Sequence, residues 1–404
     1  MTIDPELSVH SYTFDGNFDG DITSAISDLE LENVEGAYRA SWSFDGEQIS
    51  EGGLRAWFYN RLMYQIKIIY GGQNVWSGYV WEMELLIGKL SFKRSMTEMA
   101  NVLAATYSSD GDLAYVEFDG SATDLPSGTS VDENDSVWLS ANESVTQYGR
   151  HEQVLDSNGS VDEAKNLAYT GIGTIPDPFN RSIVYKPQDK SVLRITAVGR
   201  MVIVNKFKLL SERLRYHPNY EDLSWEDTER KNIDWTVGDE VARIVDLINY
   251  HSGWLYPIKI ADNDTLTKVG VSSTTGAFDR LVELTKLTNS NGDRYQLQIT
   301  EDGGVVYDVY DETPRYMLQT AEIGIRNYDN TIPKWDAQPG IVKSVAGWAG
   351  PILPTSWLGD NTLIPIERTT MRQSDEFASF YSRTIDVVEM ENALYAHLRS
   401  LEED

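Results

Sequence analysis

The stretch QIKIIYGGQNVWSGYVWEMEL at residues 65–85 decides the fold class of this chain. In its first half, Ile66, Ile68 and Tyr70 share one face of an extended backbone, because side chains on a strand alternate with a period of two. Residues 71–74 (GGQN) supply a turn. In the second half, one face carries the apolar side chains Tyr79, Trp81, Met83 and Leu85. The stretch therefore predicts a β-hairpin with one buried and one wetter face.

Outward from this hairpin, the pattern predicts more strands and a few short helices. Further strands are predicted at residues 89–93, 114–118, 191–197 and 201–206, with a second hairpin at residues 295–309. Apolar residues three and four apart predict helices at residues 161–169 (capped from Ser160), at 240–251 (capped by Asp239), after Thr274 or Thr275, and at 374–401. Residues 96–106 are predicted to form helical turns. The fold class is therefore mainly β with α+β parts, short helices and a C-terminal helical segment.

The length of 404 residues suits two to four domains. Composition shifts divide the chain into five segments. The first three are a β domain at 1–118, an exposed Ser/Asp/Gly-rich loop at 119–143, and a region at 144–231 that continues the first domain with a short helix and strands. The last two are an α+β unit at 232–332 and a Pro-rich extended segment with a C-terminal helix at 333–404. Because loop residues of this kind bury little apolar area, we expect proteolysis to cut first within residues 119–143.

Charge and composition exclude several classes of function. The chain has 63 acidic and 34 basic residues, a formal net charge of -29, and no cysteine. A surface this negative repels nucleic acid and anionic membranes, since phosphate binding needs clustered Lys and Arg. Without cysteine there is no disulfide, thiol nucleophile or thiolate metal site. With no apolar run of about 18 residues and no leader-like N-terminus, we expect a soluble protein without a targeting signal.

Motifs for catalysis, cofactors and metals are not found. The five histidines are scattered, and His151-Glu152 lacks the second metal-binding histidine of a zinc protease helix, because Leu155 stands in its place. The Gly-Ile-Gly at residues 171–173 is followed by Pro176, which ends any helix that would receive a phosphate. We therefore predict no enzymatic activity, no cofactor and no metal.

The segment DGNFDG at residues 15–20 has two interpretations. It matches the opening of a calcium-binding loop, with oxygen-bearing side chains at positions one, three and five and glycine at position six. However, Ile26 stands at position twelve, where a bidentate Glu is needed. We favour an Asp/Gly-rich turn between strands, and whether Asp15 to Asp19 binds calcium stays open.

Glu82 and Glu84 form a second acidic pair, on the wetter face of the hairpin. Their spacing along a strand is about 6–7 Å from the rise per residue, which is near that of the two carboxylates in inverting glycosidases. Trp76 and Trp81 lie close by in the sequence. A sugar-cleaving site is thus one hypothesis, and a solvated strand face above an aromatic core is the favoured one.

Three stretches resemble one family of proteins. Residues 38–44 (YRASWSF) with the hairpin at 61–83 look like the opening antiparallel barrel of phage tail proteins. Residues 144–152 (SVTQYGRHE) resemble the S-x-x-x-Y-G-R-x-E segment of baseplate hub and tail-tip hub proteins of long-tailed phages. The predicted helix from Val161 follows where those proteins carry one. In this motif we expect Gly149 to adopt a backbone conformation that a side chain would hinder, and Arg150 to pair with nearby acids.

The resemblance implies a structural virion protein of a siphophage-type tail, assembled in the host cytoplasm. It implies tail-tube-like β-barrel domains, a second of them in the α+β unit, and a homotrimeric ring that continues the tail tube for DNA passage. Its partners would be the tail tube or distal tail protein and other tail-tip or fibre proteins, without specific nucleic-acid binding. A receptor- or carbohydrate-binding tail module, or a glycan hydrolase, are the alternatives.

Overall fold

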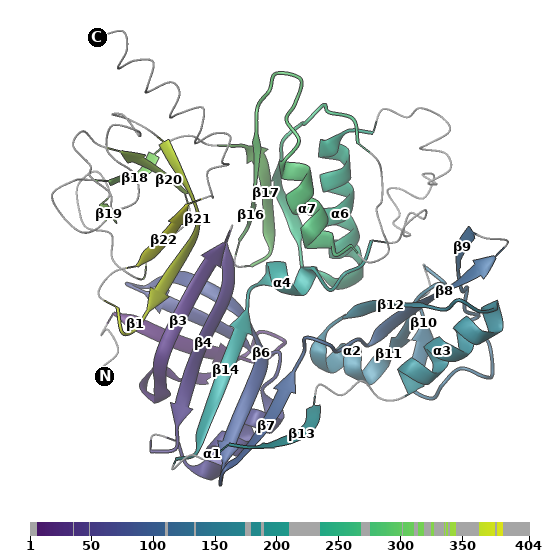
Figure 1. Cartoon of the computed structure of the whole chain (residues 1–404), viewed down its shortest axis with the longest axis horizontal. Helices are drawn as coiled ribbons and strands as arrows, with labels where there is room; N and C mark the ends of the chain where they lie inside the picture. Colours follow the sequence, from purple (N-terminus) through teal and green to yellow (C-terminus); the bar gives the residue numbers. More distant parts are fainter. Residues whose placement is uncertain are drawn as a thin grey trace, which may run out of the picture.

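A computed structural model describes residues 6–382 with internal gaps (35, 48, 110–111, 133–134, 174–178, 187–189, 210–234, 268–274, 301, 311–313, 319–324, 327–334, 336, 338–339, 345–362 and 376–377). It consists mainly of antiparallel β-sheet with a few helices (Figure 1). The predicted fold class is confirmed at this level. Among the described residues, no helix is both long and apolar enough to cross a membrane.

The largest sheet has 14 strands. They are β1 (Leu7–Tyr12), β2 (Phe18–Asp21), β3 (Ile26–Val34), β4 (Ala37–Asp45), β5 (Gln65–Tyr70), β6 (Gln73–Ile87), β7 (Leu90–Ser95), β13 (Phe179–Tyr185), β14 (Val192–Val198), β18 (Pro314–Leu318), β19 (Ile325–Arg326), β20 (Gly340–Ser344), β21 (Leu363–Arg372) and β22 (Ser379–Ser382). The main path runs β19-β18-β20-β21-β3-β4-β14-β6-β5-β1-β2. In the described part of the chain no pairing joins its two ends, so the predicted barrel closure is unconfirmed.

The hairpin that decides the fold class is confirmed as β5 and β6. Gly71 and Gly72 form its tight turn, both with positive φ. Along β6, Trp81, Met83 and Leu85 are buried whereas Glu82 and Glu84 are partly exposed, as the alternation predicts. The 15-residue β6 pairs with β5 through its first half, with β7 through its second half, and with β14 along the other edge. It therefore pairs with three other strands of the sheet.

Helix α1 (Glu51–Asn60) lies against β6 and β14 of this sheet, and the short 3-10 helix η1 (Thr23–Ala25) lies beside β1. Ser50 caps α1 by accepting a hydrogen bond from the Gly53 backbone N–H. The helix buries Leu54, Trp57 and Phe58 in the main core.

A first unit is inserted in the chain between β7 and β13. Its elements are β8 (Val102–Ser109), β9 (Asp112–Tyr115), β10 (Thr129–Val131), β11 (Leu139–Ala141), α2 (Asn142–Tyr148), β12 (Glu152–Asp156) and α3 (Val161–Gly173). The predicted helix from Val161 is confirmed, and Ser160 caps it together with Glu163. Two predictions are wrong here. Residues 102–106 form a strand instead of helical turns, and residues 119–143 are not one exposed loop, because they include β10, β11 and the fully buried Trp138.

A second unit follows β14. It contains α4 (Arg200–Val204), α6 (Val237–Ser252), β15 (Tyr256–Ile260), α7 (Ala277–Thr285), β16 (Tyr295–Ile299) and β17 (Gly304–Val309). The hairpin β16–β17 and the helix α6 are confirmed, although Thr236 rather than Asp239 is the cap, with Asp239 closing a capping box. Residues 201–206 were predicted as a strand and instead begin with α4. The described strands of this unit form a three-stranded sheet beside two helices, so a second barrel is also unconfirmed.

The chain then returns to the first sheet. Strand β21 pairs with β3, more than 300 positions away in the sequence, and the Gln373 side chain accepts a hydrogen bond from the Leu29 backbone N–H. The described strands within residues 333–404, which were predicted to be a separate extended segment with a helix, therefore belong to the main sheet. Residues 379–382 form β22 where a helix was predicted. The remaining part of that helix, residues 383–404, lies outside the described residues. The sequence predicted five consecutive segments. The strand pairing instead shows one large sheet into which two units are inserted along the chain.

Candidate functional site

Residues 148–152 lie at a junction between the main sheet and the two inserted units. Helix α2 ends at Tyr148, and Gly149 turns the chain with φ 77°. A Cβ at Gly149 would lie 3.1 Å from Trp254 Cζ2 in the second unit and 3.2 Å from Phe14 Cζ beyond β1. Both the positive φ and the close rings disfavour a side chain at this position. The predicted requirement for glycine is confirmed.

Arg150 is held by two carboxylates in this junction. Its Nε donates to Glu152 Oε1 at 2.6 Å, and its Nη1 donates to Asp132 Oδ2 at 3.2 Å. The Arg150 side chain is 10% exposed, and its guanidinium lies 5.8 Å from the Trp138 ring centroid. The prediction that Arg150 pairs with local acids is confirmed, and the Nε and Nη1 groups of its guanidinium are occupied by these two carboxylates.

The two acids are themselves fixed by other parts of the chain. The fully buried Glu152 carboxylate accepts a hydrogen bond from the Lys208 backbone N–H at 2.8 Å. His251, in the last turn of α6, places Nδ1 3.5 Å from Asp132 Oδ2. Sequence reasoning missed Asp132 and His251, because they lie 18 positions before and 101 positions after Arg150 and no spacing pattern connects them. In addition, Asp132 fell within the segment that was predicted to be an exposed loop.

His151 is buried beside the network without belonging to it. Its Nε2 donates to the Tyr148 backbone oxygen at 2.9 Å, and its backbone N–H donates to Asn101 Oδ1 at 2.8 Å. Its ring lies 5.5 Å from that of Trp81. Burial in this apolar setting lowers the His151 pKa to about 4, since the charged form loses its hydration. The imidazole is therefore neutral at pH 7, and its ring nitrogen toward Tyr148 is already used.

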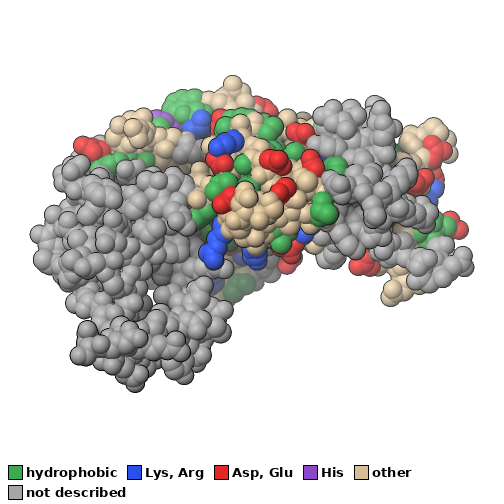
Figure 2. All heavy atoms as spheres, turned by 90° about the horizontal axis from the view of Figure 1, so that it is seen from above, with side chains coloured by type: hydrophobic (Ala, Val, Ile, Leu, Met, Phe, Trp, Pro, Cys, Tyr) green, Lys and Arg blue, Asp and Glu red, His purple; other side chains and the backbone are tan. Residues whose placement is uncertain are grey.

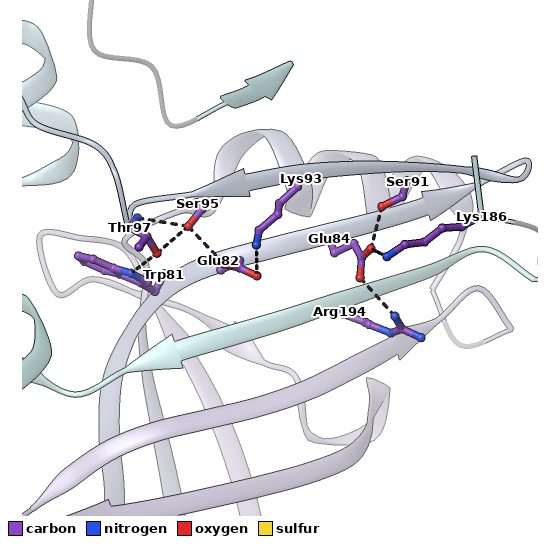
Figure 3. Close-up of polar contacts among 9 residues, drawn as sticks. All are labelled: Trp81, Glu82, Glu84, Ser91, Lys93, Ser95, Thr97, Lys186 and Arg194. Atoms are coloured by element: carbon purple, nitrogen blue, oxygen red, sulfur yellow. Dashed lines mark hydrogen bonds and ion pairs between the residues drawn. The ribbon is translucent and has the colours of Figure 1, made fainter. Parts of the chain in front are cut away.

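The second candidate, Glu82 and Glu84, lies on the outer face of β6 (Figure 3). Glu82 pairs with Lys93 at 2.8 Å and accepts a hydrogen bond from Ser95 at 3.3 Å. Glu84 is contacted by three donors from neighbouring strands or their ends, namely Ser91, Lys186 and Arg194. The two carboxylates lie on one face as predicted, and cations from β7, β14 and the end of β13 neutralise them.

These contacts decide what Glu84 can do chemically. Partial burial raises its pKa, but the hydrogen bonds from Lys186, Ser91 and Arg194 and the charge of Lys186 outweigh burial, and the net pKa is lowered. A glycosidase general acid needs the opposite, a raised pKa that keeps the proton at neutral pH. Trp76 is fully buried and Trp81 nearly so, so neither ring offers a stacking platform for a sugar. The pair fits the solvated strand face that was favoured.

The third candidate, the segment at residues 15–20, forms a turn at residues 15–17 and continues into β2 from Phe18. The turn connects β1 to β2, and the Thr13 backbone N–H donates to the Asn17 backbone oxygen at 2.8 Å. Gly16 has φ 83°. Asp19 forms an ion pair with Arg61, which neutralises one of the oxygens that a calcium ion would need. Within the described ranges, no group of three or more His, Asp or Glu side chains is arranged to hold a metal ion.

Comparisons with known proteins find distant similarity among solved structures. Searches with protein-family models and against curated proteins give no match. Solved structures similar to this chain include the 43 kDa tail protein of prophage MuSo2 from Shewanella oneidensis, at 8% identity and a TM-score of 0.39. The match covers 94% of this chain and 97% of that protein. At this identity and TM-score, the similarity establishes neither a shared fold nor a shared role.

Proposed function

We propose that this chain is a structural protein of a phage tail, a hub that forms a homotrimeric ring at the tail tip or baseplate and continues the tail tube. The observation that carries the proposal is the position of residues 144–152. This segment is the most specific part of the resemblance to hub proteins, and its Gly149, Arg150 and Glu152 build the junction on which three parts of the chain meet. Residues that hold parts of the chain together are typical of a structural protein.

The charge of the chain supports a role in DNA passage. Acidic and apolar side chains are interspersed over the described part of the face in Figure 2, without one large basic patch. With a net charge of -29, a ring of three copies would present a negative bore, and like charges would keep DNA from adhering to it. We therefore propose DNA passage without specific nucleic-acid binding and no membrane contact, with the tail tube or distal tail protein and other tail-tip or fibre proteins as partners.

Open strand edges support assembly into a ring. In the described part of the sheet, β2 pairs with β1 alone and β13 pairs with β7 alone. Near the end of β13, Val184 and Tyr185 are exposed beside Leu90 on β7. Edges of this kind, with unpaired backbone and apolar side chains, are covered in stable proteins, and closure in a ring would cover them.

The alternatives make different predictions about glycans. A receptor- or carbohydrate-binding module would bind glycan arrays as a single subunit, whereas a hub would not. A glycan hydrolase would release reducing sugar and lose this activity in Glu82→Gln and Glu84→Gln. The pairing of Glu84 with two cations argues against the hydrolase, and we propose that the chain has no enzymatic activity.

Native mass spectrometry across a salt series tests the hub directly. Because self-repulsion at this net charge opposes association, we expect trimers to form more readily as ionic strength rises. A chain that stays monomeric at every salt concentration, and that also fails to enter the tail in partially assembled virions, would rule out the hub. Binding to a glycan array by the monomer would favour the carbohydrate-binding module instead.

A further inference from the structure

The first inserted unit has a hydrophobic core of its own. We call residues 102–147 and 153–173 the arm, residues 148–152 the strap, and the other described residues the body. Two buried apolar clusters in the arm contain arm residues alone, apart from Ala100 at the edge of one of them. The main cluster contains body residues and Tyr148 of the strap, with no arm residue. In Figure 1 the arm extends to one side of the main sheet. It is therefore packed as a separate unit.

The strap is anchored to the body at both ends. Tyr148 belongs to the main core, and its hydroxyl accepts a hydrogen bond from Arg94 Nη2 at 3.4 Å. At the other end, the Glu152 backbone N–H donates to the Lys206 oxygen at 3.2 Å. Asn101, just before the arm begins, donates to the Gly149 oxygen at 2.8 Å. The strap and Asn101 thus form a fixed line from which the arm projects.

Away from this line, the arm reaches the body through a charged contact. Asp132 lies between β10 and β11 of the arm, and its Oδ2 is 3.2 Å from Arg150 of the strap and 3.5 Å from His251 of the body. Arg150 is already oriented by Glu152, which the Lys208 backbone N–H orients in turn. The strap and body therefore present a preformed receptor for one carboxylate. The side chains of Asp132, Arg150 and His251 are 4–11% exposed.

We propose that Asp132 is a latch, and that the arm turns away from the body about the strap when this contact opens. A buried ion pair gives up much of its Coulombic energy to the desolvation of its partners, so opening it to water is far less unfavourable than separating apolar surfaces of equal area. By contrast, both arm clusters would stay intact during such a motion, because Ala100 at the edge of one of them is the one described body residue that packs against them. Removing the Asp132 charge leaves Arg150 and His251 without their ligand from the arm and shifts the equilibrium toward the open arm.

The chain contains no cysteine, so spin labels can be placed without background. Thr123→Cys puts one label on the arm and Lys286→Cys puts another just after α7 of the body, both at exposed positions. In otherwise unchanged protein, double electron–electron resonance should give one main distance. We expect Asp132→Asn to raise the population of a second distance at least tenfold. Asp124→Asn is the matched control, since Asp124 is an exposed arm acid that pairs within the arm with Lys165.

Hydrogen exchange of β8 and α3 separates a moving arm from an unfolded one. The latch is supported if Asp132→Asn gives the second distance while these amides stay protected and Asp124→Asn behaves like the parent. It is overturned if Asp132→Asn leaves the distance unchanged. It is also overturned if protection of β8 and α3 is lost, because the carboxylate would then be needed for folding of the arm. Neither outcome depends on whether the protein is a tail hub.

Discussion

Acid should destabilise this protein through His151. The imidazole is buried, its Nε2 donates to the Tyr148 oxygen, and its pKa is lowered from 6.5 to about 4 because burial opposes the charged form. The unfolded chain binds a proton at His151 below about pH 6.5, whereas the folded chain does not until about pH 4. Stability from this group is therefore complete at pH 7 and decreases as the pH falls through this window.

The magnitude follows from the difference between the two pKa values. At 1.36 kcal/mol per pKa unit, the free energy of unfolding should fall by about 2 kcal/mol between pH 7 and pH 5 and by about 3 kcal/mol at pH 4 from this group. Acid also neutralises carboxylates throughout the chain, and that contribution is shared by wild type and variants. A comparison of pH dependences therefore isolates His151.

Urea denaturation at pH 7 and pH 5 measures this difference. His151→Gln can still donate to the Tyr148 oxygen, but it cannot take up a proton. The variant should therefore lose about 2 kcal/mol less than wild type on acidification, although we expect it to be less stable than wild type at pH 7. His10→Gln, in the partly exposed part of β1, controls for loss of an imidazole elsewhere. Nitrogen-15 shifts of labelled histidine should identify the Nε2–H tautomer at pH 7. Equal pH dependence in wild type and His151→Gln would refute the reasoning.

Three further predictions follow from other contacts. Gly149→Ala should lower the free energy of unfolding by about 1–3 kcal/mol, because it adds steric contact to a positive φ, whereas Gly16→Ala, with open space around its Cβ, should cost less in the same thermal melts. Glu240→Gln should cost about 3–5 kcal/mol because it removes the negative charge that compensates the buried Arg243. Glu283→Gln, in a half-exposed pair, should change stability by less than about 1 kcal/mol. Limited proteolysis should spare residues 137–141, which are mostly buried; early cutting there would contradict the structure.

Local patterns in the sequence predicted the local elements well. The hairpin β5–β6, the helices α3 and α6 and the hairpin β16–β17 are each defined by apolar periodicity and by turn or cap residues within a short window. The helix predicted over residues 374–401 was wrong at β22, where the strand exists because β21 pairs beside it. Strand β21 in turn depends on β3 at the other end of the chain. Periodicity within a window cannot detect such a partner.

The sequence predicted only part of the candidate site. Gly149 and Arg150 could be predicted because one needs a positive φ and the other needs acids nearby. Asp132 and His251 could not, since their roles follow from the way in which two insertions fold back on the main sheet. Composition was misleading for residues 119–143, where polar residues outnumber apolar ones but Trp138 and its neighbours fill a small core.

A junction made of charges can hold the arm and the body in one relative orientation for as long as the Asp132 contact is closed. Apolar packing of similar volume would often be at least as stable as buried ion pairs, so stability alone does not explain Arg150, Glu152 and Asp132. A guanidinium bonds to carboxylates in fixed directions, however, and each of these two acids approaches a different nitrogen. An apolar surface could slide, whereas this contact is satisfied in one geometry and opens when that geometry is lost. In the ring that we propose, directional contacts at this junction would define which arrangement of the arm and the body is presented to neighbouring subunits.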